Sequence, residues 1–426
     1  MTGEFPQSEL VEQTLHPAMR LAILGSLLVI FTLLIWNAGR AGISSLLSSY
    51  AATTNQIVPA DAAVEFSRGD PEAKYLRATI LKANNDLVGA ITEYNQAVSL
   101  RPDDYVLWLS LARARSLNDD TAGALAASRQ AVKLAPYYAQ PRWQLGNLLL
   151  RAGEYDEAFN ELRLAGASNP TMLPAVIDLA WQLSDGDAQF VMQSIQPQTP
   201  ETYLALAQFF RKRGAAVEAI DMYVSAGDIG KQDRGSYLSE LISAKRFKEA
   251  HALWLLGHPG NSTNAVGVIN DGGFERESNL DEPGFGWRAA SKVPSLHLDT
   301  NAPEEGRSSL RVDFDGNSDP AAPVISQLLL VDPATHYQLR FAARTEEIVS
   351  GGPPRLIIID ANNGRVIAQS EEFPKQTAGW QYFTVDFNSA DSTAAIQIAL
   401  QRQQCSTSPC PIFGRLWLDA FALQKL

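Results

Sequence analysis

The sequence predicts a chain of three structural parts: a membrane-spanning helix near the N-terminus, an all-α repeat array and a C-terminal all-β sandwich. Three observations carry this prediction. Residues 21–39 contain no charged side chain. Pro102, Pro136 and Pro170 recur at intervals of 34 residues, each after a short apolar run. In the last third of the chain, apolar and polar residues alternate, for example over 336–343, as they do in β-strands.

The composition of the 426-residue chain limits its function. At about 150 residues per domain, this length allows two or three domains. The net charge of −12 argues against bulk nucleic-acid binding, which needs clustered positive charge. We therefore expect no nucleic-acid partner.

Cys405 and Cys410 are the two cysteines of the chain. They do not make a structural zinc site, because such a site usually takes four ligands and no nearby histidine completes the set. We expect a small disulfide loop, which implies an oxidising compartment. The alternative is a pair of free thiols in the cytosol.

The uncharged segment 21–39 is long enough to cross a bilayer. As a helix it spans about 28 Å, close to the thickness of the hydrocarbon layer. Arg20 and Arg40 bracket it, and Trp36 suits the membrane interface. We expect a short cytoplasmic segment over 1–20, a transmembrane helix over 21–39 and a juxtamembrane helix or spacer over 40–70.

The orientation of this helix is not decided by its flanking arginines, whereas the cysteine pair favours export of the C-terminal part. We therefore expect a single-pass protein of the bacterial inner (cytoplasmic) membrane, held in the lipid bilayer by 21–39, with its bulk facing the periplasm or the exterior. A cleaved signal peptide is the alternative. Against it, the leading segment is long and carries Glu4, Glu9 and Glu12 rather than lysines.

Small and aromatic residues accompany each of the three prolines at fixed places. In three consecutive units they are Ala78, Ala90, Tyr94 and Ala97; Trp108, Leu111, Ala112, Ala124 and Ala131; and Leu145, Gly146, Ala158 and Ala165. This pattern resembles the tetratricopeptide repeat, a helix pair that buries its apolar face by stacking on its neighbours into a solenoid. The resemblance covers 71–256. It weakens after Pro170, where Pro197 interrupts a second helix.

The resemblance implies a groove lined by the first helix of each repeat. Side chains one turn apart share a helix face, so the expected groove residues are Tyr75, Lys82, Arg113, Gln140, Trp143, Asn147, Arg151, Arg211 and Lys212. Most of the charged ones are basic. The hypothesis is that the groove takes an acidic or carboxy-terminal peptide of a protein partner, or an anionic glycan. The alternative is that these residues form ordinary solvated helix faces.

The C-terminal part begins after 257–265, which predicts a linker because glycine, proline and small polar residues dominate it. Beyond it come the motifs INDGGFE (269–275), GW (286–287), GRSSL (306–310), GW (379–380) and LWLD (416–419). Their order resembles the jelly-roll carbohydrate-binding modules found beside glucanase and xylanase domains. The resemblance implies a jelly-roll β-sandwich over 266–426.

Two sites follow from the second resemblance. In that family a structural calcium often joins the first and last strands through one carboxylate on each, and Glu275 and Asp419 match those places; the alternative is a pair of ordinary surface acids. No other cofactor is expected. A polysaccharide-binding face is implied as an analogy from the fold. Its candidate residues are Trp287, Gln338, Arg340, Arg344, Gln401 and Arg402.

The sequence contains no Gly-x-Ser-x-Gly elbow, no His-Glu-x-x-His helix and no complete Walker loop, so we expect no enzyme. The order of the parts resembles that of accessory proteins of bacterial exopolysaccharide assembly and export. We therefore expect a membrane-anchored scaffold or adaptor of the cell envelope that recruits a protein partner through its repeats. A glycan-binding receptor and a glycan-modifying enzyme are the alternatives.

Overall fold

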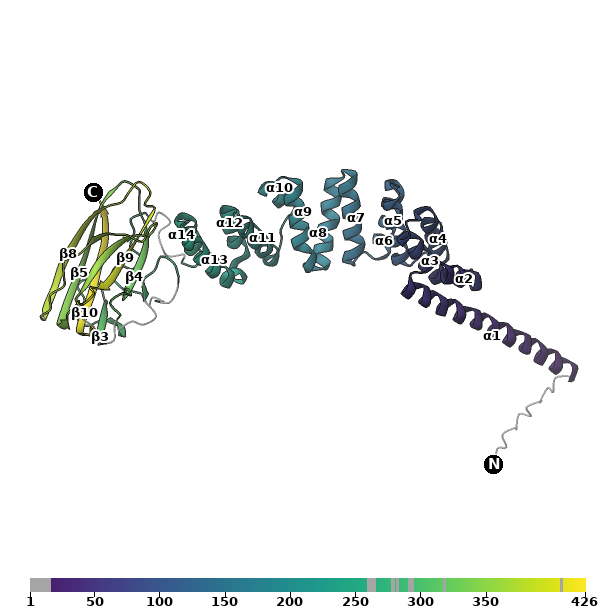
Figure 1. Cartoon of the computed structure of the whole chain (residues 1–426), viewed down its shortest axis with the longest axis horizontal. Helices are drawn as coiled ribbons and strands as arrows, with labels where there is room; N and C mark the ends of the chain where they lie inside the picture. Colours follow the sequence, from purple (N-terminus) through teal and green to yellow (C-terminus); the bar gives the residue numbers. More distant parts are fainter. Residues whose placement is uncertain are drawn as a thin grey trace, which may run out of the picture. The chain divides into compact units, whose positions relative to one another are not determined.

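The computed structural model describes residues 17–258, 266–276, 280, 283–289, 295–316, 319–406 and 409–426 (Figure 1). The chain divides into two compact units, Met1–Gln196 and Pro197–Leu426. The division falls inside the helical array, between two repeats. Most of the expected linker 257–265 and the expected cytoplasmic segment 1–20 lie outside the described residues.

The first unit is entirely helical over its described residues. Its elements are α1 (Pro17–Thr54), α2 (Ile57–Phe66), α3 (Pro71–Ala83), α4 (Leu87–Leu100), α5 (Tyr105–Leu117), α6 (Thr121–Leu134), α7 (Ala139–Ala152), α8 (Tyr155–Ser168), η1 (Pro170–Met172), α9 (Leu173–Leu183) and α10 (Ala188–Ile195). The odd-numbered helices α3, α5 and α7 begin 34 residues apart, which is the period expected from the prolines.

Local sequence explains where these helices begin and turn. Asp70, Asp86, Asp104 and Asp120 each accept a hydrogen bond from a backbone N–H in the first turn of the helix that follows, an arrangement that caps α3 to α6. The turns inside the repeats take a residue with positive φ, again 34 residues apart: Asn85, Asp119 and Gly153. Asparagine, aspartate and glycine tolerate this left-handed conformation best.

The small residues of the repeat pattern lie where two helices approach most closely. Ala78, Ala90 and Ala97 are buried in one cluster with Tyr94. Gly146 on α7 faces α8, since a Cβ added to it would lie 2.7 Å from Leu162 Cγ. A larger side chain at these places would push the helix pair apart.

Helix α1 is continuous from Pro17 to Thr54 and is long and apolar enough to cross a membrane. The expected juxtamembrane range 40–70 contains the last 15 of the 38 residues of α1 and all of α2, and the two helices pack together. Ser44 donates to Ala63 O at 2.9 Å, and Ala51, Ala60 and Ile80 share an apolar cluster. This end of α1 is therefore joined to the repeats.

The irregular unit expected after Pro170 is present. Helix α10 has only eight residues and ends at Ile195, where Gln196 takes a positive φ of 47°. Pro197 follows and cannot continue a helix, because it lacks the N–H that the preceding turn would bond.

The second unit contains four α-helices, one 3₁₀ helix (η2) and ten strands over its described residues. They are α11 (Pro200–Arg213), α12 (Ala216–Ala226), η2 (Gly227–Gly230), α13 (Lys231–Ser243), α14 (Phe247–Leu255), β1 (Arg288–Ala289), β2 (Ser295–Asp299), β3 (Ser309–Asp315), β4 (Ile325–Leu330), β5 (His336–Ser350), β6 (Pro354–Asp360), β7 (Val366–Gln369), β8 (Ala378–Asn388), β9 (Ala395–Arg402) and β10 (Ile412–Lys425).

The strands form a β-sandwich of two antiparallel sheets, ordered β1-β4-β9-β6-β7 and β2-β3-β10-β5-β8. Alternate residues of both sheets meet in one core, which contains Val312 and Phe341 from one sheet and Ile358 and Ile398 from the other. The sandwich expected from the alternating pattern is confirmed. Its assignment as a jelly roll stays a prediction.

Candidate functional site

Three basic side chains lie on successive first helices of the repeats: Lys82 on α3, Arg113 on α5 and Arg151 on α7. We call them the basic row. Contacts between α5 and α7 fix two of them, because Arg113 donates to Gln144 Oε1 at 3.4 Å and Arg151 donates to Ser116 Oγ at 3.3 Å. Lys82 Nζ lies 6.0 Å from the centre of the Tyr94 ring.

The electrostatics of the basic row favour a negative ligand. Burial lowers the pKa of Lys82, and the charge of Arg113 lowers it further, so the two cations repel each other. Within the described part of the chain, no carboxylate forms an ion pair with Lys82, Arg113 or Arg151. Other arginines of the repeats do have such partners, for example Arg142 with Glu161 at 2.7 Å. The basic row is thus a cluster of positive charge without internal compensation.

The other groove residues predicted in this unit lie near the basic row in sequence but differ in exposure. Tyr75 is half-buried and packs on Tyr94, with ring centroids 5.9 Å apart. Gln140 is exposed at the start of α7, and Trp143 is half-buried. Asn147 donates to Trp143 O at 2.7 Å. Their role in binding stays a prediction.

Arg211 and Lys212 are on α11, in the second compact unit. Arg211 is held inside its own repeats, where it forms ion pairs with Glu240 and Asp233 and lies 5.2 Å from the centre of the Tyr237 ring. These partners, Glu240 first, raise the pKa of Arg211. Its charge is therefore balanced within the chain, unlike that of the basic row. Lys212 is exposed.

The residues predicted for a polysaccharide-binding face do not lie on one surface. Trp287 is 2% exposed, and its indole N–H donates to Asp271 O at 3.0 Å, so it belongs to the core of the sandwich. Arg402 on β9 is also buried, and its guanidinium donates to the carbonyls of Gly352, Cys410 and Pro411. Gln401 donates to Ala321 O at 3.2 Å.

Gln338, Arg340 and Arg344 do share a surface, because they alternate with core residues along β5. This surface carries three aromatic side chains from neighbouring strands, Trp417 on β10 and Trp380 and Tyr382 on β8, which we call the aromatic row. Arg344 Cζ lies 4.1 Å from the centre of the Trp417 ring and 5.5 Å from that of Trp380. Arg340 Cζ lies 4.0 Å from that of Tyr382. Tyr382 was not among the predicted residues. The alternation of Phe383, Val385 and Phe387 along β8 would have placed it on the outer face of the sheet.

The segment between β2 and β3 covers part of the aromatic row. Trp417 donates to Asp299 Oδ2 at 2.7 Å, Trp380 donates to Ala302 O at 2.9 Å, and Tyr382 donates to Glu305 Oε1 at 3.1 Å. These bonds use the polar atoms of all three rings. Tyr382 still leaves 43% of its surface exposed.

Glu275 and Asp419, the expected calcium ligands, converge near Gly273. A Cβ added to Gly273 would lie 3.7 Å from Asp419 Oδ1 and 3.9 Å from Glu275 Oε1. Asp419 is buried, and burial raises its pKa although the N–H groups of Glu305, Ala420 and Glu304 bond it. Glu275 has a lowered pKa, chiefly because Arg307 N donates to Oε1 at 2.8 Å.

The fit of these residues to a calcium ion is partial. Both carboxylates approach Gly273, which suits a cation, but the Glu275 carboxylate already pairs with Arg307 at 3.4 Å. Calcium takes six to eight oxygen ligands, however, and the described residues contain no group of three or more histidine, cysteine or carboxylate side chains that could hold a metal. Backbone oxygens would have to complete the set, so the calcium site stays a prediction.

Cys405 and Cys410 are joined by a disulfide that closes the loop between β9 and β10. Sγ of Cys405 would lie 3.2 Å from a Cβ added to Gly351 and 3.3 Å from one added to Gly352. The disulfide therefore packs directly on the β5–β6 turn.

Comparison with known proteins identifies the repeats. The family model of the tetratricopeptide repeat matches residues 71–104, which contain α3 and α4. A search of curated protein sequences finds no match. The helix pairs α5–α6 and α7–α8 continue the matched repeat at the same spacing.

Several solved structures are similar to part of the chain. "MamA 41-end" from Desulfovibrio magneticus RS-1 is 15% identical, with 37% of this chain and 94% of that chain covered and a TM-score of 0.32. YrrB, described as a TPR protein with an unusual peptide-binding site, is 17% identical, with coverages of 43% and 84% and a TM-score of 0.32. Pseudomonas aeruginosa pilF is 15% identical, with coverages of 46% and 93% and a TM-score of 0.33. The tetratricopeptide repeat itself suggests a scaffold for protein–protein interaction.

Proposed function

We propose that this protein is a membrane-anchored, non-enzymatic scaffold of the bacterial cell envelope that recruits an acidic segment of another protein. The observation that carries the proposal is the basic row, three cations on adjacent first helices with no ion-pair partner in the described part of the chain. The matched repeat at 71–104 supports a protein-binding role.

A carboxylate is the ligand that this arrangement favours most. Placed between Lys82 and Arg113, it relieves the repulsion between them and replaces the solvation that Lys82 has lost. Arginine offers a planar fork of donors that matches a carboxylate, and such charge-assisted bonds are stronger than neutral ones. The partner segment is therefore rich in aspartate and glutamate, or ends in a free carboxyl group.

The cellular setting is proposed from the ends of the chain. Helix α1 has the length and composition of a membrane anchor. The disulfide between Cys405 and Cys410 agrees with an oxidising compartment such as the periplasm. The order of anchor, repeats and sandwich favours a place in exopolysaccharide assembly or export.

Binding of a labelled acidic peptide to the full chain tests the proposal. The probe is a fluorescein-labelled peptide of alternating glutamate and aspartate with a free carboxyl end, followed by anisotropy at low salt. Reversing the row with Arg113→Glu and Arg151→Glu is expected to weaken binding at least about tenfold, since each reversal replaces attraction by repulsion. Reversing two exposed lysines of second helices, Lys133 on α6 and Lys248 on α14, is the control with the same change of net charge and should leave the affinity nearly unchanged. Equal affinity of both variants and the wild type would refute a basic groove.

A second function is favoured by the aromatic row. Tyr382, with Arg340 against its ring, is an exposed aromatic side chain on the outer face of β8. Gln338 and Asp386, hydrogen-bonded to each other at 2.9 Å, lie on the same face four residues further along β5 and β8. Sugars stack on such aromatic platforms and bond the polar groups around them. Binding of the full chain to bacterial polysaccharides that is lost in Tyr382→Ala would support a glycan receptor, and equal binding by both chains would exclude this platform.

A further inference from the structure

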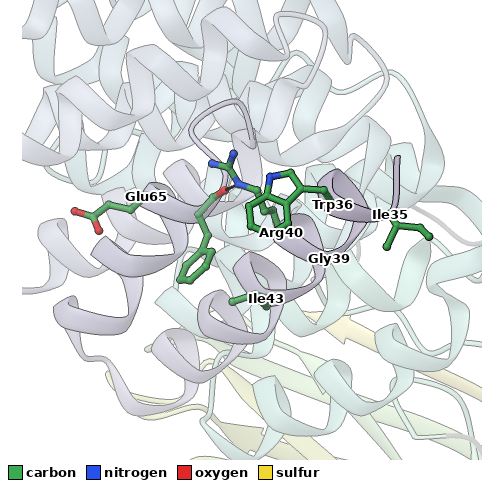
Figure 2. Close-up of a pocket in the computed structure, with 7 residues that line it drawn as sticks. Ile35, Trp36, Gly39, Arg40, Ile43 and Glu65 are labelled. Atoms are coloured by element: carbon green, nitrogen blue, oxygen red, sulfur yellow. Dashed lines mark hydrogen bonds between the residues drawn. The ribbon is translucent and has the colours of Figure 1, made fainter. Parts of the chain in front are cut away.

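A hollow of about 610 Å³ lies where α1 and α2 meet (Figure 2). Its walls are Trp36, Gly39, Arg40 and Ile43 of α1, with Glu65 and Phe66 at the end of α2. This volume is within the range of about 300–1,000 Å³ found for small-molecule sites. Nothing in the function proposed above uses it.

The chemistry of the hollow is apolar with one cationic group. Trp36, Ile43 and Phe66 are large apolar side chains that are all exposed. Arg40 lines the hollow, and its Nε donates to Phe66 O at 2.8 Å, whereas its two terminal amino groups make no hydrogen bond to another described residue. Figure 2 shows the Glu65 carboxylate directed away from this guanidinium, and the described ion pairs do not join the two residues.

The place of the hollow along α1 indicates its surroundings. Arg40 is the first charged residue after the uncharged segment 21–39, which spans about 28 Å as a helix. If α1 crosses the bilayer, as the proposed function requires, the hollow lies at the level where hydrocarbon gives way to headgroups. Tryptophan is enriched at this level, and arginine places its charged end there while its stem stays in apolar surroundings.

We propose that the hollow binds one phospholipid of the surrounding bilayer. Its phosphate lies on the Arg40 guanidinium, and the upper part of its acyl chains lies against Trp36, Ile43 and Phe66. An anionic headgroup is preferred to a zwitterionic one, because choline would bring a second positive charge next to Arg40. The lipid would hold the end of α2 to the membrane and so fix how the first repeat leaves the bilayer surface.

Two glycines of α1 allow a test that leaves the fold intact. A Cβ at Gly39 or at Gly42 would meet nothing within 4 Å, so the backbone of α1 accepts a side chain at either position. Only Gly39 is among the residues that line the hollow. Gly39→Leu therefore fills the site, and Gly42→Leu is the matched control with the same added side chain one turn away.

The full chain is purified in detergent, incubated with equal amounts of phosphatidylglycerol and phosphatidylcholine of identical acyl chains, and analysed by native mass spectrometry. The wild type and Gly42→Leu are expected to retain one phosphatidylglycerol, and Gly39→Leu and Arg40→Gln to retain at least about tenfold less. Equal retention by all four chains, or equal retention of both lipids by the wild type, would overturn the proposal.

Flotation of the full chain with liposomes separates this proposal from the anchoring on which it rests. A chain that does not float with liposomes is not anchored, and the lipid site fails with the anchor. A chain that floats while Gly39→Leu and Gly42→Leu retain lipid equally is anchored but has no lipid site at Arg40.

Discussion

Trp254, at the end of the last repeat helix, packs on Phe285 of the β-domain with the two ring centroids 5.9 Å apart. His258 stacks on the Trp254 ring at 4.2 Å, and His251 meets Phe285 edge-on at 4.8 Å. Lys245, in the turn before α14, also donates to Ala361 O at 3.0 Å. The last repeat and the sandwich thus share an apolar interface, which explains why one compact unit contains both.

Gly284 is the residue that allows this interface to form. Its φ is +137°, and a Cβ added to it would overlap Trp254 Cδ1 and lie 2.7 Å from Nε1. We predict that Gly284→Ala destabilises the second unit by about 1–3 kcal/mol, because either the indole or the backbone must move. The measurement is hydrogen exchange of peptides from α14, which should become faster.

Gly286→Ala is the control for this prediction. A Cβ at Gly286 would lie 3.9 Å from Trp254 Cζ2, an ordinary contact, and its φ is not in the left-handed region. Exchange in α14 should stay at the wild-type rate in this variant. If α14 of Gly284→Ala also exchanged hydrogen as slowly as α14 of the wild type, the Trp254 contact would not hold the last repeat to the sandwich.

The same interface predicts sensitivity to acid. His251 is buried, and burial lowers its pKa below the value of about 6.5 that it has in the unfolded chain. The folded state therefore binds fewer protons than the unfolded state as the pH falls past 6.5, and the second unit loses stability in that direction. Above pH 6.5 the stability associated with His251 is fully present.

The check is the melting temperature of the full chain at pH 8 and at pH 5.5. We predict that His251→Phe loses less melting temperature on acidification than the wild type, because phenylalanine fills the space without taking up a proton. His336→Gln, which removes an exposed histidine, should behave like the wild type. A drop as large in His251→Phe as in the wild type would place the acid sensitivity elsewhere.

The repeat array was predictable because its signals are local and periodic. The spacing of Pro102, Pro136 and Pro170 gave the period of the helix pairs, and Gly146 marked a close approach that the structure contains. The end of α1 was not predictable in this way. A serine gives no sign in the sequence that it will be buried. Ser44 is buried because α1 packs on α2, where its hydroxyl group donates to Ala63 O.

The surface of the sandwich was harder to predict than its strands. Trp287 was expected on a binding face and lies in the core, because its one polar atom finds the carbonyl of Asp271. Arg402 has the sequence context of a solvated strand residue, yet carbonyls of the disulfide loop satisfy it inside the protein. Such partners are brought together by the fold and leave no pattern in the sequence.

The basic row makes a prediction about Lys82 that needs no ligand. Burial and, after it, the charge of Arg113 lower the pKa of Lys82. Arg113→Gln removes the second cause, so the pKa of Lys82 should rise towards its ordinary value. The measurement is the pH titration of ¹³C-dimethylated lysines by NMR, with Lys82 assigned by Lys82→Arg. Arg129→Gln, on the second helix α6, is the control and should leave the titration of Lys82 unchanged.

Removing calcium and adding it back tests whether Glu275 and Asp419 bind a cation. If a cation sits between these carboxylates, calcium added to the chelator-treated chain raises its melting temperature, because a ligand at 100 times its dissociation constant stabilises by about 2.7 kcal/mol. Magnesium should do so far less, since it requires a tighter octahedral set of ligands.

Burial raises the pKa of Asp419, so protons compete with the cation and the calcium effect should shrink as the pH falls. Glu275→Gln should abolish the effect and Glu371→Gln, at an exposed acid, should preserve it. A wild-type melting temperature that does not change with calcium would mean that the two carboxylates serve only as hydrogen-bond acceptors within the protein.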